Sequence, residues 1–386
     1  MTAVWHALRA ELSGILGDAQ VRLIVLAALV IYAVIYPYPY RAELLRDVPV
    51  VLVDLDRSPT SADLARRVDA SEAVAITGDA PDMGVAIRAV QDRRAYGVLL
   101  IPEGFERDLL RGRQSPVALY ADASYFLIYQ RVMQGAAIPL RQLGAEVEVA
   151  RLVAGGTQPA VALAQVSPVE QVEVPLFNPA AGYATYVLPA AFVLILQQTM
   201  MMGLALVATR RPGRAAVGRM AGAGHPVWSV LGRMAAWVLV YAAVLPLYLI
   251  VLPAVYGLPL LGGAGTILML GLPFVLAVGL LAQCVAALLR RAEVGQVVLL
   301  AVGLPFFFLS GFAWPMEAIP PTLGLAAQIL PSTPAIDGLV RAARMGAGPA
   351  DIAPILWHLW ILVAAFGAIA LVLEAGPGRR VRAPRP

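Results

Sequence analysis

The stretch FFFLSGFAWPMEAIPP, residues 306–321, interrupts a segment that otherwise has the composition of a membrane span. Gly311, Trp314–Pro315, Glu317 and Pro320–Pro321 stand where leucine and valine would continue a helix. Proline lacks an amide hydrogen and clashes with the preceding turn, so one continuous helix cannot cross this stretch. Broken backbone is tolerated at membrane depth only inside protein or beside a water-filled cavity. The stretch therefore predicts either a buried break after an apolar helix or an ordinary solvated loop.

The composition of the whole chain is that of a polytopic membrane protein. Of 386 residues, 60% are hydrophobic and 14% are charged, and the mean hydropathy is +0.75; a soluble domain carries roughly a quarter charged residues. All 29 basic residues are arginine, which excludes a Walker A lysine and lysine Schiff-base chemistry. The single cysteine, Cys284, can form no internal disulfide. No basic stripe with interleaved aromatic residues suggests nucleic-acid binding.

Apolar stretches of about 20 residues are long enough to cross the hydrocarbon core of a bilayer. We expect six such transmembrane helices, with helices three to five lying within 234–313. The stretches are 21–37, 183–208, 234–256, 265–288, 295–313 and 353–373.

Arginine placement predicts the orientation of these helices. Residues 1–20 have helical apolar spacing and predict an amphipathic interfacial helix. Arg9 and Arg22 lie at the start of the chain, and further arginines lie in the loop 209–233, after the fourth span and in the tail 374–386. In a six-span count all these segments fall on one side, so the positive-inside rule makes both termini cytoplasmic. An inner-membrane, multi-pass protein is expected.

Residues 38–182 then lie outside and are long enough to fold alone. VPVVLVDLD, AVAIT, AYGVLLIP and SPVALYAD are predicted strands, alternating with helices that begin after Ser58 and near residues 81 and 103. A long helix is expected over 124–154, and VEQVEVPLF alternates like a returning strand. Alternating strands and helices predict an external, periplasmic α/β domain.

Two aspartates in VVLVDLDRSPT, Asp54 and Asp56, offer a catalytic interpretation. Their spacing places both on one face of a strand and resembles the phosphatase motif of the haloacid dehalogenase superfamily. The alternative is a strand end followed by a helix cap. No adjacent acidic pair follows that could complete a Mg²⁺ site, so phosphatase activity is the minor alternative.

Polar residues inside the predicted spans are candidates for a translocation path. A polar side chain in hydrocarbon usually faces a partner or a cavity, so hydrogen bonding between helices is an equal alternative. No charged residue lies at the centre of a span, which argues against ion coupling. If the protein transports a substrate, its energy source then lies outside the chain. The candidates are Gln197, Gln198, Thr199, Gln283 and Gln296.

Four stretches, in order along nearly the whole chain, resemble the permease subunits of type-2 ABC (ABC-2) exporters, in the bacterial branch with a large external domain between spans one and two. They are VDLDRSPTSADLARRV, YGVLLIPEGFERDLLRGRQSPVALYADAS, FNPAAGYATYVLPA, and FLSGFAWPMEAIPP followed by LPSTPAIDGL.

The resemblance implies that residues 314–352 form short re-entrant helices at an outer gate. The residues matching the family pattern there are Ser310, Gly311, Trp314, Pro315, Pro320 and Pro331. It also implies a cytoplasmic ABC ATPase that binds a coupling loop, here carrying Arg210, Arg211, Arg214 and Arg219. The family often has a glutamate-rich helix start in that loop, whereas this loop has no acid, so an arginine run facing anionic lipid is the alternative.

The expected function is therefore outward transport of a drug-like or lipid-like amphiphile by a non-enzymatic subunit. The chain itself needs no cofactor, because ATP and Mg²⁺ would bind the partner ATPase. A second permease copy and, in this branch, a periplasmic adaptor are implied partners. The alternative from another class is a membrane-anchored external binding or scaffold protein that transports nothing.

Overall fold

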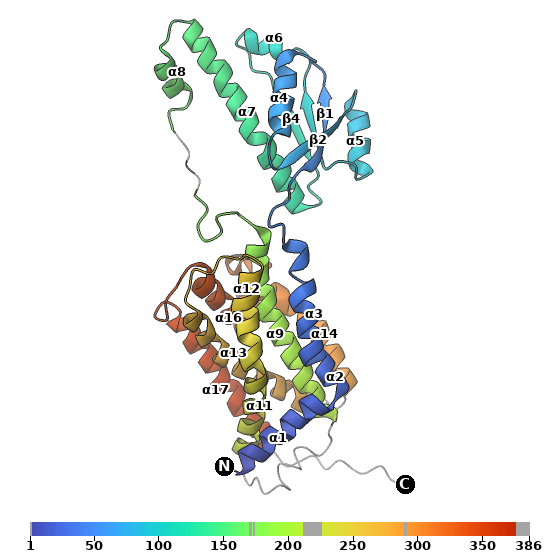
Figure 1. The fold of residues 1–386 in the computed structure, drawn as a ribbon, viewed down its shortest axis with the longest axis vertical. Coiled ribbons are helices and arrows are strands. Elements are labelled where there is room, and N and C mark those ends of the chain that lie inside the picture. The colour runs from blue at the N-terminus through green and yellow to red at the C-terminus, as the bar shows by residue number, and fades with distance from the viewer. Residues whose placement is uncertain (1, 170–171, 173, 211–225, 289–291, 376–386) are drawn as a thin grey trace. The chain divides into compact units, whose positions relative to one another are not determined.

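The computed structural model describes residues 2–169, 172, 174–210, 226–288 and 292–375 (Figure 1). The chain divides into two compact units, each described separately below. The inserted domain is Leu44–Val174, and the helical unit consists of Met1–Glu43 and Pro175–Pro386.

The inserted domain is a three-layer α/β fold around a four-stranded sheet of order β2-β1-β3-β4. The central pairs β2-β1 and β1-β3 are parallel, and β4 joins β3 antiparallel. One side of the sheet forms a core with α4, α6 and α7, and the other packs on α5. The strands are β1 (Val48–Asp54), β2 (Val74–Asp79), β3 (Gly97–Ile101) and β4 (Ala118–Ala121).

The helices of this domain begin where the sequence supplies caps. Ser58 caps α4 (Pro59–Asp69) through the amide of Ser61, with Pro59 in the first turn; both features were predicted. Asp82 caps α5 (Met83–Gln91) in the same way. The others are α6 (Phe105–Leu110), α7 (Phe126–Ala154) and α8 (Pro159–Val166).

One prediction for this region was wrong, and one helix was missed. The described residues of VEQVEVPLF form no strand, because alternation alone does not stabilise a strand that has no pairing neighbour. The short helix α8 was not predicted; it starts at Pro159, which is pre-organised for a first helical turn.

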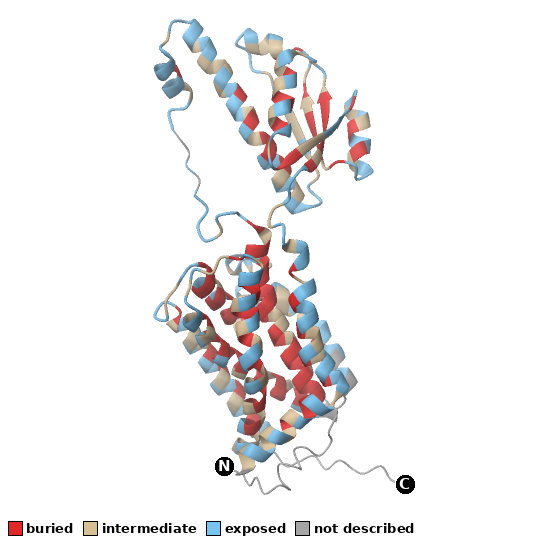
Figure 2. Ribbon diagram, in the orientation of Figure 1, coloured by how far each residue is buried: buried red, intermediate tan, exposed pale blue. Residues whose placement is uncertain are grey.

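In the helical unit, five stretches among the described residues are long and apolar enough to cross a membrane. Two of them, α9 and α13, are mostly buried, whereas most of the first, third and last stretches is exposed (Figure 2). Val297–Leu309 is a shorter apolar helix. The five stretches are Ala19–Tyr40, Tyr183–Ala208, Pro226–Val255, Ala264–Ala287 and Ala353–Ala375.

Two of these stretches, the first and the third, consist of several consecutive helical segments. The first span combines α2 (Ala19–Arg22), the π-helical turn η1 (Leu23–Ala27), α3 (Ala28–Ile35) and η2 (Tyr38–Tyr40), after α1 (Thr2–Gly17). The third combines α11 (Pro226–Pro246), η3 (Leu247–Val251) and α12 (Leu252–Val255). The remaining elements are α9 (Tyr183–Arg210), α13 (Ala264–Leu288), α14 (Ala292–Leu309), η4 (Met316–Ala318), α15 (Pro321–Ala327), α16 (Ser332–Leu339), η5 (Val340–Arg344) and α17 (Ala353–Ala375).

Two helix boundaries differ from those predicted. The third span begins at Pro226, so residues 226–233, expected in the loop 209–233, are helical. Pro226 explains this start, since proline is favoured in a first turn. The fifth helix, expected to reach 313, ends at Leu309, because Gly311 then adopts φ +78°.

The helix α1 packs along α11 and does more than present an apolar face to lipid. A Cβ added to Gly232 would lie 2.5 Å from Ala7 Cβ and 2.6 Å from the Val4 carbonyl oxygen, so only glycine allows the two helices to approach this closely. Glu11 is 3% exposed and accepts a hydrogen bond from Trp237 Nε1 at 3.2 Å. Close packing against α11 therefore buries the carboxylate of Glu11.

Candidate functional site

The chain after α14 runs into the interior of the helical unit and then returns. Tyr186, near the start of α9, donates to the Phe312 carbonyl at 2.6 Å. Twenty residues later, the Ser332 amide donates to Gln197 Oε1 at 3.0 Å. Gln197 lies about 21 Å along α9 from Tyr183, at a rise of 1.5 Å per residue. The segment 310–331 therefore leads from the beginning of α9 to its middle.

The return path runs through α16 and η5. The Leu261 amide, in the connection between α12 and α13, donates to the Ala343 carbonyl at 2.8 Å. Tyr256, at the start of that connection, donates to the Ala33 carbonyl near the end of the first span at 3.1 Å. Since α9 also begins beside the end of the first span, the segment 310–344 is a hairpin that starts and finishes at one end of the unit.

The residues predicted to break the fifth helix lie at the turns of this hairpin. Ser310 Oγ donates to the Phe307 carbonyl at 2.7 Å and closes the helix end. Three prolines directly precede short helices: Pro315 before η4, Pro320 before α15 and Pro331 before α16. Trp314 is 58% exposed. The predicted break is confirmed, and a gating role for these six residues stays a prediction.

Aromatic rings connect the hairpin to the ends of the first span and α9. Successive ring centroids lie 5.8, 5.6, 6.2 and 4.8 Å apart. Such pairs add about 0.5–1.5 kcal/mol each beyond their buried area. The rings belong to Tyr36, Tyr40, Tyr183, Tyr186 and Phe312.

Three adjacent polar residues in the middle of α9 bind three different elements. Gln197 holds α16, as described above. Gln198 Nε2 donates to the Leu299 carbonyl of α14 at 2.7 Å. Thr199 Oγ1 contacts the hydroxyl of Tyr241 on α11 at 3.1 Å. These contacts make α9 the polar centre of the unit and give Gln198 and Thr199 the helix-to-helix bonds that the sequence left as one of two alternatives.

The other two path candidates are not brought to this centre by any described contact. Gln283 on α13 is 9% exposed, and its Nε2 has no hydrogen-bond partner among the described residues. Gln296 lies within α14, but its side chain is outside the described residues.

Two functional candidates missed by sequence reasoning lie where the hairpin begins and ends. Glu43 accepts from the Thr185 hydroxyl at 2.7 Å and from its amide at 3.2 Å, and so caps the first turn of α9. Arg344 is 4% exposed and donates to the Pro259 carbonyl. A lone glutamate and an arginine in RAAR carry no spacing signal that reveals either contact.

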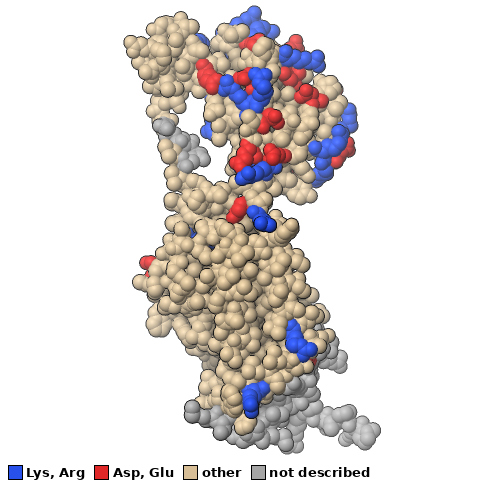
Figure 3. Space-filling model, in the orientation of Figure 1, with Lys and Arg blue, Asp and Glu red and all other residues tan. Residues whose placement is uncertain are grey.

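At the α1 end of the unit, α11 is also tied to α17. Arg233 donates to Glu374 Oε2 at 2.6 Å, and Ser229 donates to Glu374 Oε1 at 3.3 Å. Figure 3 shows few charges on the visible face of the helical unit, whereas many lie on the inserted domain. Of the predicted coupling arginines, Arg211, Arg214 and Arg219 lie outside the described residues, and Arg210 is the last residue of α9.

The two aspartates of the phosphatase interpretation serve as caps in the inserted domain. Asp54 accepts from Ser61 Oγ at 2.6 Å and from the amides of Asp56 and Arg57. Asp56 accepts from the Glu106 amide at 3.0 Å. Burial raises the pKa of Asp56, but hydrogen bonds from Ser58 and from the backbone near Glu106 outweigh it, so the net pKa lies below its usual value. A capping role accounts for the contacts of both carboxylates.

The sequence profile of the ABC-2 family transporter proteins matches residues 20–372. This chain belongs to the ABC-2 transporter family. The match covers the inserted domain, the hairpin and, apart from the outermost residues of the first and last, the five candidate spans. No curated protein matches the chain. As an ABC-2 family member, the protein is a membrane permease of an ABC transporter, and its polar centre on α9 lies within the family's transport domain.

Proposed function

We propose that this ABC-2 protein is the permease subunit of an exporter that moves an amphiphilic, drug-like or lipid-like substrate outward with energy from a separate ATPase. Family membership, which implies an ATPase in the system, is the observation that carries the proposal. The absence of lysine supports a separate ATPase, because a Walker A motif needs one. ATP and Mg²⁺ would then bind the partner chain.

The proposed path follows α9 through Gln197, Gln198 and Thr199, with Gln283 and Gln296 as further candidates. Their support is that neutral polar groups in the middle of apolar helices can bind an amphiphile without a charged site. The outer gate would be the hairpin that begins with Ser310 and Gly311. Its backbone is irregular, and its second half is buried in protein, as broken backbone at membrane depth must be.

We place the protein in a bacterial inner membrane with six spans, cytoplasmic termini and an external inserted domain. Counting α14 as the sixth span is supported by its 18 residues, which extend about 27 Å, close to the thickness of a hydrocarbon core. The arginine distribution supports the orientation.

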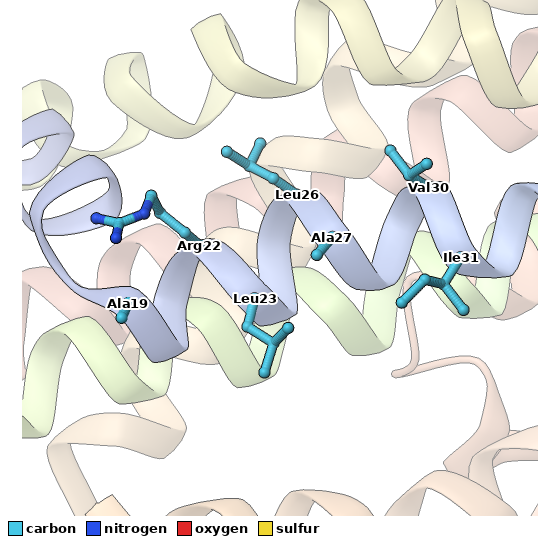
Figure 4. Close-up of a pocket in the computed structure, with 7 residues that line it drawn as sticks. All are labelled: Ala19, Arg22, Leu23, Leu26, Ala27, Val30 and Ile31. Carbon is cyan, nitrogen blue, oxygen red and sulfur yellow. The ribbon is translucent and has the colours of Figure 1, made fainter.

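A second permease copy would complete the transporter. The first span exposes apolar side chains around a shallow groove lined by Leu23, Leu26, Val30 and Ile31, with Arg22 at one end (Figure 4). Either lipid or another helix could cover this face. A periplasmic adaptor remains a proposed partner of the inserted domain.

The alternative of a membrane-anchored binding or scaffold protein is weaker. An anchor needs neither a polar centre nor a buried hairpin. The phosphatase alternative is weaker still, since Asp54 and Asp56 already accept several hydrogen bonds from the domain itself.

The test is to isolate the tagged chain from native membranes in mild detergent and identify its companions by mass spectrometry. An ATP-binding subunit in near-equal amount is the expected result, and a second, differently tagged copy should co-purify if the permease is a homodimer. Arg210, Arg211, Arg214 and Arg219 changed together to Gln should release the ATPase. The matched control changes the four tail arginines, Arg379, Arg380, Arg382 and Arg385, to Gln. Absence of an ATPase in several mild detergents would contradict the proposal.

A further inference from the structure

Two hydroxyl groups at the start of α16 are buried and have no hydrogen-bond partner among the described residues. Ser332 is 0% exposed and Thr333 is 5% exposed, and the unpartnered atoms are Ser332 Oγ and Thr333 Oγ1. A buried hydroxyl without a partner costs about 1–3 kcal/mol. Helical serine and threonine usually avoid this cost by donating to a carbonyl one turn earlier, as Thr199 does to the Ile195 carbonyl at 2.7 Å.

The backbone around these hydroxyls is already satisfied. The Ser332 amide donates to Gln197 Oε1 at 3.0 Å, and the Thr333 amide donates to the Leu330 carbonyl at 3.1 Å. Pro334 has no amide hydrogen, and the Ala335 amide donates to the Pro331 carbonyl at 3.2 Å. The groups still able to donate in this first turn are therefore the two hydroxyls.

Packing holds these hydroxyls in place. The helix α16 lies against α9, α13 and α17, and Ala335 and Ile336 are 4% and 5% exposed. A Cβ added to Gly338 would lie 2.8 Å from a Leu270 methyl carbon. A helix enclosed on three sides cannot turn the hydroxyls toward solvent without disrupting its other contacts.

The chemistry of the site favours an acceptor oxygen. Each hydroxyl can donate one hydrogen, and the Gln197 amide carries two more. The beginning of a helix also has a partial positive charge. The ligand would be a carbonyl, ether or ester oxygen on an otherwise apolar molecule, because the contact to Gln197 lies half-way along α9.

We infer that Ser332 and Thr333, with Gln197, form a subsite that binds the hydrogen-bond-accepting oxygen of the transported molecule. This inference rests on the proposed transport function and adds the chemical class of the substrate group. A water molecule could provide the same oxygen, so the experiment distinguishes the two sources.

The first measurement is the unfolding temperature of the full chain in detergent. Ser332→Ala and Thr333→Val, singly and together, should leave it unchanged or raise it, because each substitution removes an unsatisfied group. A clear decrease would mean that the hydroxyls stabilise the folded chain itself, and would overturn the inference.

The second measurement uses thiol reactivity in native membranes, in a Cys284→Ala background. Methyl methanethiosulfonate should modify Thr333→Cys about tenfold faster than Ala335→Cys, which is equally buried on the same helix but does not belong to the subsite. 2-Octanone, which offers only an acceptor oxygen, should slow the reaction at Thr333→Cys by about threefold to tenfold, the effect of one hydrogen bond. Nonane should not, and Ser332→Ala should abolish the protection.

Each other outcome contradicts the inference in a defined way. Equally slow modification of both cysteines would show sealed packing. Fast modification without protection by 2-octanone would show a site that holds water only. Because the assay requires no ATPase, its failure is distinct from failure of the proposed function, which the co-isolation experiment tests.

Discussion

Gly311 decides, as a single residue, where the fifth helix ends. Its φ of +78° is in the left-handed region, which costs a residue with a Cβ about 1–2 kcal/mol. A Cβ there would also lie 2.6 Å from Met316 Cγ. Proline makes a continuous helix impossible further on, but Gly311 is what permits the turn after Leu309.

We therefore predict that Gly311→Ala lowers the free energy of unfolding of the full chain by about 1–2 kcal/mol. The measurement is denaturant unfolding in detergent. Gly324→Ala, within α15 and with no atom closer than 4.0 Å to an added Cβ, is the matched control and should leave the free energy of unfolding unchanged or raise it by up to about 1 kcal/mol. Equal effects of the two substitutions would contradict the role given to the backbone angle.

Tyr248 connects the third span to the first through a single hydroxyl. It is fully buried, donates to the Leu29 carbonyl, and packs edge-on against Phe192 at 5.4 Å. Tyr248→Phe keeps the ring contact and removes the hydrogen bond, so we expect a loss of about 1 kcal/mol. Thermal unfolding in detergent measures it, with the exposed Tyr38→Phe as control; an unchanged Tyr248→Phe variant would show that the bond adds no net stability.

At the scale of elements, α4 and α7 of the inserted domain are joined by Arg67. Its guanidinium donates to Asp63 on its own helix and to Glu146 on α7, both at 2.7 Å. The hydrogen bonds from Arg67 hold the pKa of Asp63 and of Glu146 below their usual values. Glu146 is exposed and Asp63 is half-buried, so the benefit is modest and sensitive to salt.

The sign of the pH dependence follows from these lowered pKa values. The stability contributed by the two carboxylates is present above their ordinary pKa of about 4 and is lost as the pH falls through the lower folded pKa. We predict that α4 and α7 lose amide protection below about pH 4, and that Arg67→Gln weakens this dependence. Hydrogen exchange of the full chain, corrected for intrinsic rates, measures it. Arg88→Gln on α5 is the control, and an identical pH profile for Arg67→Gln would refute the linkage.

At the scale of the whole molecule, the two units have separate hydrophobic cores. The core of the helical unit is built around α9 and α13, and the inserted domain has a core on each face of its sheet. Leu99, in the central part of the sheet, is 0% exposed, as is Leu196 in the middle of α9.

We predict that Leu99→Ala destabilises the inserted domain by about 2–5 kcal/mol and leaves the helical unit protected. Hydrogen exchange of the full chain distinguishes the peptides of the two units. Leu196→Ala is the reciprocal control and should affect the helical unit alone. Loss of protection in both units after either substitution would show that they unfold as one body.

The sequence alone determined the membrane class, the inserted α/β domain and the presence of a break after the fifth helix. Composition, strand length and proline placement act locally, so they can be read from neighbouring residues, as Ser58, Pro59 and Gly311 illustrate. The sequence also indicated polar residues on α9, but not their partners.

Only the tertiary structure decided which groups meet. Hydrogen bonds join Gln197 to Ser332, Glu43 to Thr185 and Glu11 to Trp237, across separations of 135, 142 and 226 residues. No periodicity relates such distant positions, because packing between helices brings them together. The same packing buries Glu11, and the described residues of VEQVEVPLF have no strand partner. The physical reason is that burial and pairing depend on neighbours in space, whereas helix starts, turns and breaks depend on neighbours in the chain.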